Sequence, residues 1–392
     1  MTTDAYTIQK TVRLGGTAKD IVVAKTGHGL MMMTWKPTPV PDEEAFAAMK
    51  AGMDALPPSV KMMLNSAEFY GVNPREANLE LLARFFEKYP EYADKAFLSV
   101  KGGAGRESLM PDSSPENLRR SVDTINEKLR GTKRMDLFET ARIPPTNPIE
   151  ANMRVLKQLV DEGKFDHIGL SECGANTVRR ANAVVPIAAV EIEVSPWSYE
   201  QETENVIATC KELEIPVVAY SPLGRGFLTG AVTKPEDFEE GDFRRTLTRF
   251  KDENMKANAA LVAALKQVAA AKGVTPAQLS LAWVASRGPH VIPLPGSSCV
   301  LLLLLFLLRS SLLPFTRNLT LMLHASCRLV FFLADPDSDY RKAARTLENL
   351  RGGDLEMTPS ELAAVEDVRK MIPVQGGRYI DEWGEKASMH WA

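Results

Sequence analysis

The sequence predicts an α/β fold, a (β/α)8 barrel of the TIM-barrel type, because short apolar runs alternate with longer segments of helical periodicity along the 392 residues. Eight strands are expected, and eight is the number of parallel strands that closes such a barrel. An open doubly wound sheet is the alternative, but it normally carries a GxGxxG turn after its first strand. In this chain Gly27-His28-Gly29 is followed by Leu30-Met31, so that turn is absent and the barrel is favoured.

The expected strands and helices form repeated βα units. Two helix starts are marked by a capping residue followed by proline at the first helical position, at Ser114-Pro115 and at Thr275-Pro276. Strands are expected at residues 27–33, 61–65, 96–101, 134–140, 168–171, 188–193, 217–220 and 291–293, and helices at residues 43–55, 77–87, 115–129, 153–162, 177–185, 204–213 and 260–271.

The composition is that of a folded globular protein, with 45% hydrophobic and 25% charged residues. The net charge of −3 argues against a nucleic-acid partner and against an anionic membrane surface. The four cysteines form no CxxC pair, which indicates a reducing compartment and argues against a metal site. Because the N-terminus is polar and lacks the apolar core of a secretory signal, we expect a cytoplasmic protein.

Polar residues gather where the expected strands end, and in a (β/α)8 barrel the functional residues lie at those C-terminal ends. The second strand ends in Asn65-Ser66-Ala67-Glu68-Phe69-Tyr70-Gly71, the third in Lys101, the fifth in Ser171-Glu172, the sixth in Glu191 and Glu193, and the seventh in Tyr220-Ser221-Pro222-Leu223-Gly224. We therefore expect the active site at this end of the barrel.

Several of these segments resemble motifs of the aldo-keto reductase family. They are NSAEFYGVN, LSVKGG, HIGLSE, VEIEVSP, VVAYSPLGRGFLTG, VIPLPGSS and RTLEN, and they follow one another in the family's order over nearly the whole chain. Within the family, NSAEFYG and DLFETAR are most similar to fungal pyridoxal reductases. The resemblance implies NADPH-dependent reduction of a small aldehyde or ketone to an alcohol.

The resemblance makes Tyr70 the general acid and Lys101 its partner. A free phenol has a pKa of about 10, so it needs help to give up its proton near neutrality. A nearby ammonium group stabilises the phenolate and lowers that pKa. The alternatives are a core or rim tyrosine and an ordinary solvated lysine, but Lys101 ends an apolar run, which favours a site.

The resemblance also assigns a cofactor site for NADP(H). Tyr220 would stack on the nicotinamide ring, and Ser171 would hold its carboxamide. An arginine fork suits the 2′-phosphate dianion of the adenosine. The remaining assigned residues are Glu172 and Glu191 near the nicotinamide, Ser221, Leu223 and Gly224 at the pyrophosphate, and Ser297, Arg345, Glu348 and Asn349 at the adenosine end.

The chain departs from the family's pattern at the catalytic positions. Asn65 replaces an aspartate that pairs with the lysine, and Ala141 replaces a histidine; Glu172 and Glu191 replace an asparagine and a glutamine. Glu139 lies two residues before Ala141 and so faces the same side of its strand. The hypothesis is that Glu139 is catalytic and supplies, one layer deeper, the carboxylate that Asn65 lacks; the alternative is that Glu139 has no catalytic role and Asn65 is a polar placeholder in the catalytic set. The alternative is a cofactor-binding pseudoenzyme or a redox-sensing interaction subunit on the same barrel.

Residues 299–341 do not follow the βα rhythm and lie between the eighth strand and the next helix. The segment is rich in leucine, and its apolar run at 300–308 is shorter than the roughly 20 residues that span a membrane. It separates VIPLPGSS from RTLEN, which adjoin in the family. We expect one barrel domain over residues 1–392, interrupted by this insertion. The insertion is interpreted as a translated retained intron, which would make the product non-functional; a lipid-contacting or partner-binding loop is the alternative.

Overall fold

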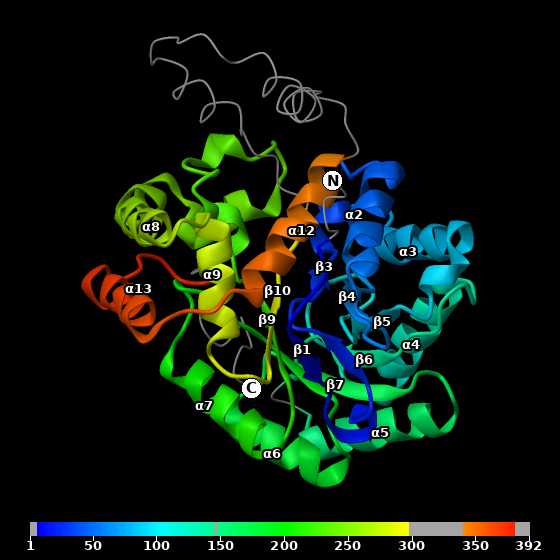
Figure 1. The fold of residues 1–392 in the computed structure, drawn as a ribbon. Helices are drawn as coiled ribbons and strands as arrows, with labels where there is room; N and C mark the ends of the chain where they lie inside the picture. The colour runs from blue at the N-terminus through cyan, green and yellow to red at the C-terminus, as the bar shows by residue number, and fades with distance from the viewer. Residues whose placement is uncertain (1–5, 145–146, 298–339, 381–392) are drawn as a thin grey trace, which may run out of the picture.

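The computed structural model describes residues 6–144, 147–297 and 340–380. Its main sheet has eight parallel strands in the order β10-β9-β8-β7-β6-β5-β4-β3, and a parallel bridge between Gly29 and Gly296 joins its two edges. The strands are β3 (His28–Gly29), β4 (Met62–Ala67), β5 (Ala96–Gly102), β6 (Leu137–Thr140), β7 (His167–Ser171), β8 (Ala189–Glu193), β9 (Val217–Tyr220) and β10 (Val291–Leu294). The (β/α)8 barrel is therefore confirmed (Figure 1).

Helices surround the barrel and follow its strands in sequence. They are α1 (Met31–Thr34), α2 (Asp42–Asp54), α3 (Ala77–Lys88), α4 (Pro115–Leu129), α5 (Ile149–Asp161), α6 (Ala175–Val184), α7 (Gln201–Glu212), α8 (Asp252–Lys272), α9 (Pro276–Ala285), α12 (Tyr340–Asp354) and α13 (Pro359–Met371). Ser114 and Thr275 cap α4 and α9 with their hydroxyl groups, as expected. In the described part of the chain, no helix has the length and apolar character needed to cross a membrane.

The interior of the barrel is layered along its axis. Its N-terminal end is apolar, because Met63, Phe97 and Leu137 point inward with Val218. Alternate residues of a strand face the same side. The next inward positions are therefore Asn65, Ser99, Lys101, Glu139 and Glu191, which are all buried. Along each strand, the inward-facing side chains thus change from apolar to polar within two to four residues.

A two-stranded antiparallel hairpin closes the apolar end. It consists of β1 (Thr11–Arg13) and β2 (Val22–Ala24). Val12 and Leu14 join the apolar cluster inside the barrel, and the backbone N–H of Gly15 donates to the carbonyl of Ala188. The hairpin lay outside the strands expected from the sequence, because each of its strands is only three residues long.

The first expected strand is partly wrong. Of residues 27–33, only His28 and Gly29 form a strand, and α1 begins at Met31. The N–H of Leu30 donates to the carbonyl of Asn65, and that of Met33 to the carbonyl of Leu30, so the chain turns away from the sheet there.

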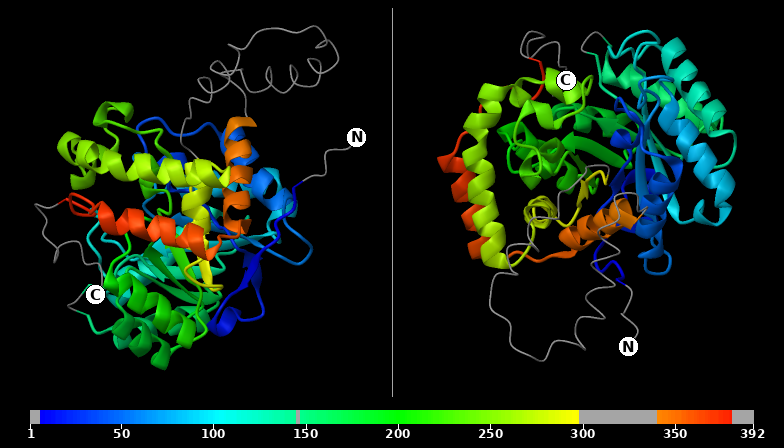
Figure 2. Two further views of the ribbon diagram at one scale, coloured as in Figure 1. Left: turned by 60° about the vertical axis from the view of Figure 1, so that its left-hand side comes forward. Right: turned by 90° about the horizontal axis from the view of Figure 1, so that it is seen from above.

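The helix after β10 in space is α12, although the two are far apart in sequence. It packs against α2 and α9 (Figure 1), and the Asn349 side chain donates to the carbonyl of Gly296 at 3.3 Å. The intervening residues 298–339, which include almost all of the expected insertion, lie outside the described residues. Helix α13 then lies along α8 on the outside of the barrel (Figure 2).

Candidate active site

Lys101 lies at the centre of a buried polar cluster formed by β4, β5 and β8. Its ammonium nitrogen is 2.5 Å from Oδ1 of Asn65 and 2.9 and 3.0 Å from the two carboxylate oxygens of Glu191. Burial alone would lower the pKa of Lys101, but the carboxylate of Glu191 raises it above its ordinary value. The lysine is therefore held as an ammonium inside the barrel.

Tyr70 follows β4 and lies beside this ammonium. The Lys101 nitrogen is 5.3 Å from the centroid of the Tyr70 ring. Burial raises the pKa of Tyr70 to about 12, while Lys101 acts in the opposite direction. The expectation that Lys101 lowers this pKa thus holds for the sign of its effect, but burial outweighs it. At neutral pH the phenol keeps its proton.

Asn65 and Glu191 together provide the partners of Lys101, including the carboxylate that is absent from position 65. The Asn65 amide nitrogen donates to Oε2 of Glu191 at 2.6 Å, and its oxygen accepts from Lys101. An amide can do both at once, since it has a donor and an acceptor end. The carboxylate that reaches Lys101 therefore comes from β8, although the sequence placed Glu191 among the cofactor residues.

Glu139 lies behind this cluster. Its carboxyl oxygen accepts from the Ser99 hydroxyl at 2.5 Å, and Ser99 in turn lies 3.4 Å from the Asn65 amide nitrogen. Gly169 makes room for it, because a Cβ there would come within 2.7 Å of the Glu139 side chain. Burial, and next the Glu191 carboxylate, raise the pKa of Glu139 well above its ordinary value. Glu139 is thus linked to Lys101 through Ser99 and Asn65.

Ala141 directly follows β6 at the rim of the barrel. Its backbone N–H donates to the carbonyl of Gly102 at 2.8 Å, and its methyl side chain carries no polar group. The chemistry of a histidine at this position is therefore absent from residue 141.

The expected nicotinamide residues lie at the ends of β7 and β9. Ser171 is buried and Tyr220 is half-buried. After Tyr220, the left-handed backbone of Ser221, Gly224 and Arg225, with φ of 51°, 55° and 54°, forms a tight loop. Successive N–H groups in such a loop form a concave anion site, which suits a pyrophosphate.

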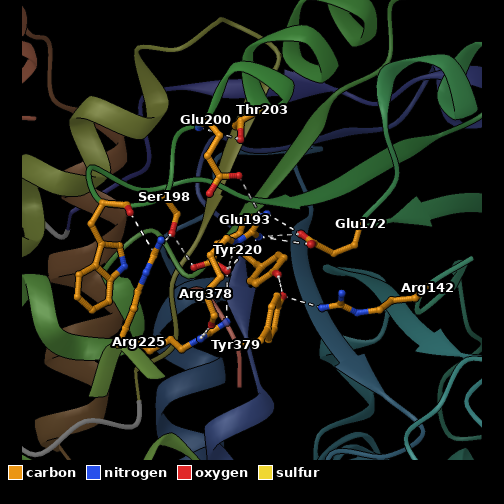
Figure 3. Close-up of polar contacts among 12 residues, drawn as sticks. Arg142, Glu172, Glu193, Ser198, Glu200, Thr203, Tyr220, Arg225, Arg378 and Tyr379 are labelled. Carbon is orange, nitrogen blue, oxygen red and sulfur yellow. Dashed lines mark hydrogen bonds and ion pairs between the residues drawn. The ribbon is translucent and has the colours of Figure 1, made fainter. Parts of the chain in front are cut away.

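A second buried cluster adjoins these residues and is shown in Figure 3. Arg378, from the segment after α13, lies between Glu172 and Glu193; its Nη2 is 3.3 Å from the first carboxylate and 3.1 Å from the second. Arg225 also pairs with Glu193 at 3.2 Å. Burial alone would raise the pKa of Glu193, but Arg225, Arg378 and Arg249 lower it to about 2.

Tyr379 extends the second cluster to Tyr220. The hydroxyl groups of the two tyrosines are 2.8 Å apart, and Arg142 donates to the Tyr379 hydroxyl at 2.6 Å. No motif or strand end in the sequence indicated Arg378, Tyr379 or Arg142 as site residues. Glu193 was expected at the end of the sixth strand, and its spacing of two from Glu191 puts both residues on the same side of β8.

The residues expected at the adenosine end are only partly brought together. The Ser297 hydroxyl is 2.8 Å from Nε2 of His28, and Asn349 bonds Gly296 beside it. Arg345 and Glu348 both lie on α12. The Glu348 carboxylate accepts from the Thr275 hydroxyl at 2.7 Å, so it faces the start of α9.

A (β/α)8 barrel with a buried tyrosine and a lysine ammonium at its C-terminal end can donate a proton to a substrate oxygen within reach. The chain belongs to the aldo/keto reductase family, whose model matches residues 25–303. Family membership assigns it to the oxidoreductases.

Among its relatives is a probable pyridoxal reductase 2 of Schizosaccharomyces pombe, which is 40% identical over 283 residues, covering 71% of this chain and 84% of the relative. An aldo-keto reductase of the same yeast, named yakc [NADP(+)], is 41% identical over 242 residues, covering 60% of this chain and 70% of the relative. The predicted family and its similarity to fungal pyridoxal reductases are therefore confirmed.

The fold also matches solved structures. A glycerol dehydrogenase of Gluconobacter oxydans superimposes with a TM-score of 0.69 at 19% identity, covering 94% of this chain and 97% of that one. At this identity the match concerns the fold alone.

Proposed function

We propose that this chain is an NADPH-dependent reductase of a small aldehyde, with pyridoxal as the first substrate to test. The observation that carries the proposal is the buried cluster of Tyr70, Lys101, Asn65 and Glu191. It holds a protonated phenol beside a fixed ammonium at the end of the barrel where the motifs for the cofactor also lie.

Tyr70 is the proton donor in this proposal. Since burial raises its pKa to about 12, the phenol is protonated over the whole neutral range. When bound, the reduced nicotinamide would supply the hydride to the carbonyl carbon. Negative charge then develops on the substrate oxygen, which takes the proton of Tyr70, and the Lys101 ammonium stabilises the phenolate that remains.

Glu191 and Asn65 are positioning residues in the same step. They hold the ammonium of Lys101 at 2.5–3.0 Å, and the same nitrogen lies 5.3 Å from the centroid of the Tyr70 ring. Burial strengthens each of these interactions, because little water screens them.

The described residues fit a dinucleotide. Ser171 and Tyr220 stand at the ends of β7 and β9, and the left-handed loop that begins at Ser221 offers N–H groups to a pyrophosphate. In Gly224 an added Cβ would come within 2.8 Å of the Trp197 ring, so this close packing requires glycine. Arg345 of α12 is the assigned reader of the 2′-phosphate.

Aromatic rings beside Tyr70 support a flat substrate. Trp35 lies 5.6 Å from the Tyr70 ring, 5.4 Å from Phe243 and 6.1 Å from Phe69, measured between ring centroids. The rings of Trp35, Phe69 and Phe243 remain partly exposed. An aromatic aldehyde can stack on such a surface, and the name of the Schizosaccharomyces pombe relative points to pyridoxal as the first choice.

The proposal is tested by NADPH oxidation with pyridoxal and with a generic aromatic aldehyde. The full chain and a chain lacking residues 299–341 are measured side by side. Turnover in both makes the segment a tolerated loop, and turnover only in the shorter chain supports the reductase and the intron interpretation. If NADPH binds to both without turnover, the pseudoenzyme alternative replaces the proposal, and the alanine at position 141 becomes its main reason.

The cofactor preference has its own test in Arg345→Met. A charge-assisted hydrogen bond to a phosphate is worth about 1.5–3 kcal/mol, so the Kd for NADPH is expected to rise about tenfold or more while that for NADH stays unchanged. Equal changes for both cofactors would contradict the assignment of Arg345.

A further inference from the structure

The segment after α13 crosses the C-terminal end of the barrel. Arg249 donates to the carbonyl of Gly376 at 3.0 Å, and the N–H of Thr248 donates to the carbonyl of Tyr379 at 3.1 Å. Gly376 has φ of +84°, and a Cβ there would come within 2.8 Å of the Asn254 side chain. These contacts fix the backbone on either side of Arg378.

The side chain of Arg378 is directed into the barrel end (Figure 3) and is only 4% exposed. Its guanidinium contacts the carboxylates of Glu172 and Glu193, which are 3% and 2% exposed. The same Glu172 carboxylate accepts from the backbone N–H of Glu193 at 3.0 Å. Three charges thus lie out of water within one hydrogen-bonded group.

The two glutamates depend on Arg378 to different degrees. Glu193 has a second cation in Arg225 and also accepts from the Ser198 hydroxyl at 3.1 Å. Glu172 makes an ion pair with Arg378 at 3.3 Å, and the Arg142 guanidinium also attracts the same carboxylate. An uncompensated buried carboxylate is strongly unfavourable. The ion pair at residue 172 is therefore made by a residue 206 positions later in the chain.

These charged residues lie next to the residues that are expected to bind the nicotinamide. Glu172 directly follows Ser171, and Glu193 is the register neighbour of Tyr220 on the adjacent strand. Tyr379, next to Arg378, bonds the Tyr220 hydroxyl. Ser171, assigned to the nicotinamide carboxamide, is thus bonded in the chain to Glu172. Tyr220, assigned to the nicotinamide ring, is hydrogen-bonded to the neighbour of Arg378.

We propose that Arg378 is a positioning residue of the cofactor site, and that the C-terminal segment completes the nicotinamide end of that site by neutralising Glu172 and Glu193. This inference rests on the proposed use of a nicotinamide cofactor. It assigns to the segment after α13 a role in binding the dinucleotide, through the shape and charge of the β7 and β9 ends rather than through the reacting atoms.

The test compares Arg378→Met, Glu172→Gln/Arg378→Met and, as a matched control, Arg287→Met. Arg287 pairs with Glu366 at 2.9 Å, is 14% exposed and lies after α9 on the outer helices. The Kd for NADP+ is measured by titration calorimetry on the full chain, and the thermal midpoint is measured for each variant.

The Kd is expected to rise by at least about tenfold in Arg378→Met, because one partner of a buried charge pair is removed. Glu172→Gln/Arg378→Met is expected to recover most of that loss, since it removes the carboxylate that has lost its ion pair with Arg378. Arg287→Met should lower the thermal midpoint without changing the Kd.

Two outcomes would overturn the inference. The first is an unchanged Kd in Arg378→Met; the second is a loss that Glu172→Gln does not recover and that follows the thermal midpoint as in Arg287→Met. If the unsubstituted chain binds neither NADP+ nor NADPH, the proposed function fails together with this inference. That result is distinguishable because it is seen before any substitution is made.

Discussion

Two buried glutamate pairs lie at the same end of the barrel, and they hold their charge in opposite ways. Glu139 and Glu191 share one cation, Lys101, whereas Glu172 and Glu193 face Arg378 and Arg225. Burial and the neighbouring carboxylate raise the pKa of Glu139, while the guanidinium groups, against burial, lower that of Glu193 to about 2.

Burial acts in the same direction on Glu139 and Glu193, so the opposite shifts of their pKa values follow from the charged groups that face them. All four side chains are almost fully buried. Where one ammonium serves two carboxyl groups, one of them retains a proton; where Arg225, Arg378 and Arg249 act on one carboxylate, Glu193 stays ionised. In the proposed reductase, the cluster around Lys101 would take part in proton transfer and the cluster around Arg378 would hold fixed charges.

The largest expected effect separates the two clusters by function. Tyr70→Phe removes the proton donor beside Lys101, so kcat should fall by about 10²–10⁴-fold while the Kd for NADPH stays unchanged. Steady-state kinetics and calorimetry measure the two quantities, and Tyr89→Phe on the outer face of the barrel is the matched control. Retention of most of the turnover in Tyr70→Phe would remove Tyr70 from its assigned role.

A smaller effect is expected when the charge of the first cluster is moved. Glu191→Gln leaves Lys101 with the neutral Asn65 and with Glu139, so turnover should fall at least about tenfold and the free energy of unfolding by about 3 kcal/mol. Asn65→Asp/Glu191→Gln returns a carboxylate to Lys101 from β4 and should recover most of both losses.

Glu139→Gln/Glu191→Gln extends the same series. It removes both carboxyl groups. Its turnover and its free energy of unfolding should be lower than those of Glu191→Gln, because Glu139 can no longer ionise to replace the lost charge. Kinetics and denaturant unfolding of the three variants give the order. If Asn65→Asp/Glu191→Gln has no higher turnover and no higher free energy of unfolding than Glu191→Gln, Lys101 does not need a carboxylate partner.

The smallest effect concerns how stability depends on pH. The pKa of Glu139 is raised above its ordinary value of 4.5, so the folded chain holds a proton that the unfolded chain releases. That contribution is complete below pH 4.5 and is lost as the pH rises through the folded-state pKa. Relative to Glu139→Gln, the unsubstituted chain should therefore lose at least about 1 kcal/mol of stability between about pH 5 and pH 9.

Glu193→Gln provides the opposite slope. The lowered pKa of Glu193 contributes stability that is present above its ordinary value and is lost as the pH falls toward about 2. The difference in the free energy of unfolding between this variant and the unsubstituted chain should thus become smaller only below about pH 4.5. Unfolding curves over the pH range compare the two variants, and parallel slopes would contradict the contrast between the clusters.

The sequence predicts the barrel well, because each strand is a separate apolar run with its own polar end. The motifs around Tyr70 and Lys101 lie on single strands or the turns that follow them, so local sequence is enough to find them. By contrast, β1 and β2 are too short to give a pattern, and Met31 begins a helix inside an apolar run that reads as a strand.

The pairings across the barrel could not be predicted in the same way. Strand alternation shows that Glu139 and Glu191 both face inward, but not which of them reaches Lys101. In register, Lys101 is the neighbour of Glu139, yet its ion pair is with Glu191 on β8. The height of a side chain inside the barrel depends on the stagger of the closed sheet, which no single strand encodes. Likewise, no local signal joins Arg378 to Glu172.

The most direct measurement uses NADPH that carries deuterium at the transferable position, with pyridoxal as the substrate and mass spectrometry of the alcohol. We expect the deuterium to appear in the product with the unsubstituted chain and its rate of appearance to fall sharply in Tyr70→Phe. An alcohol without deuterium, or no alcohol at all from a chain that binds both NADPH and pyridoxal, would contradict the assignment as a reductase.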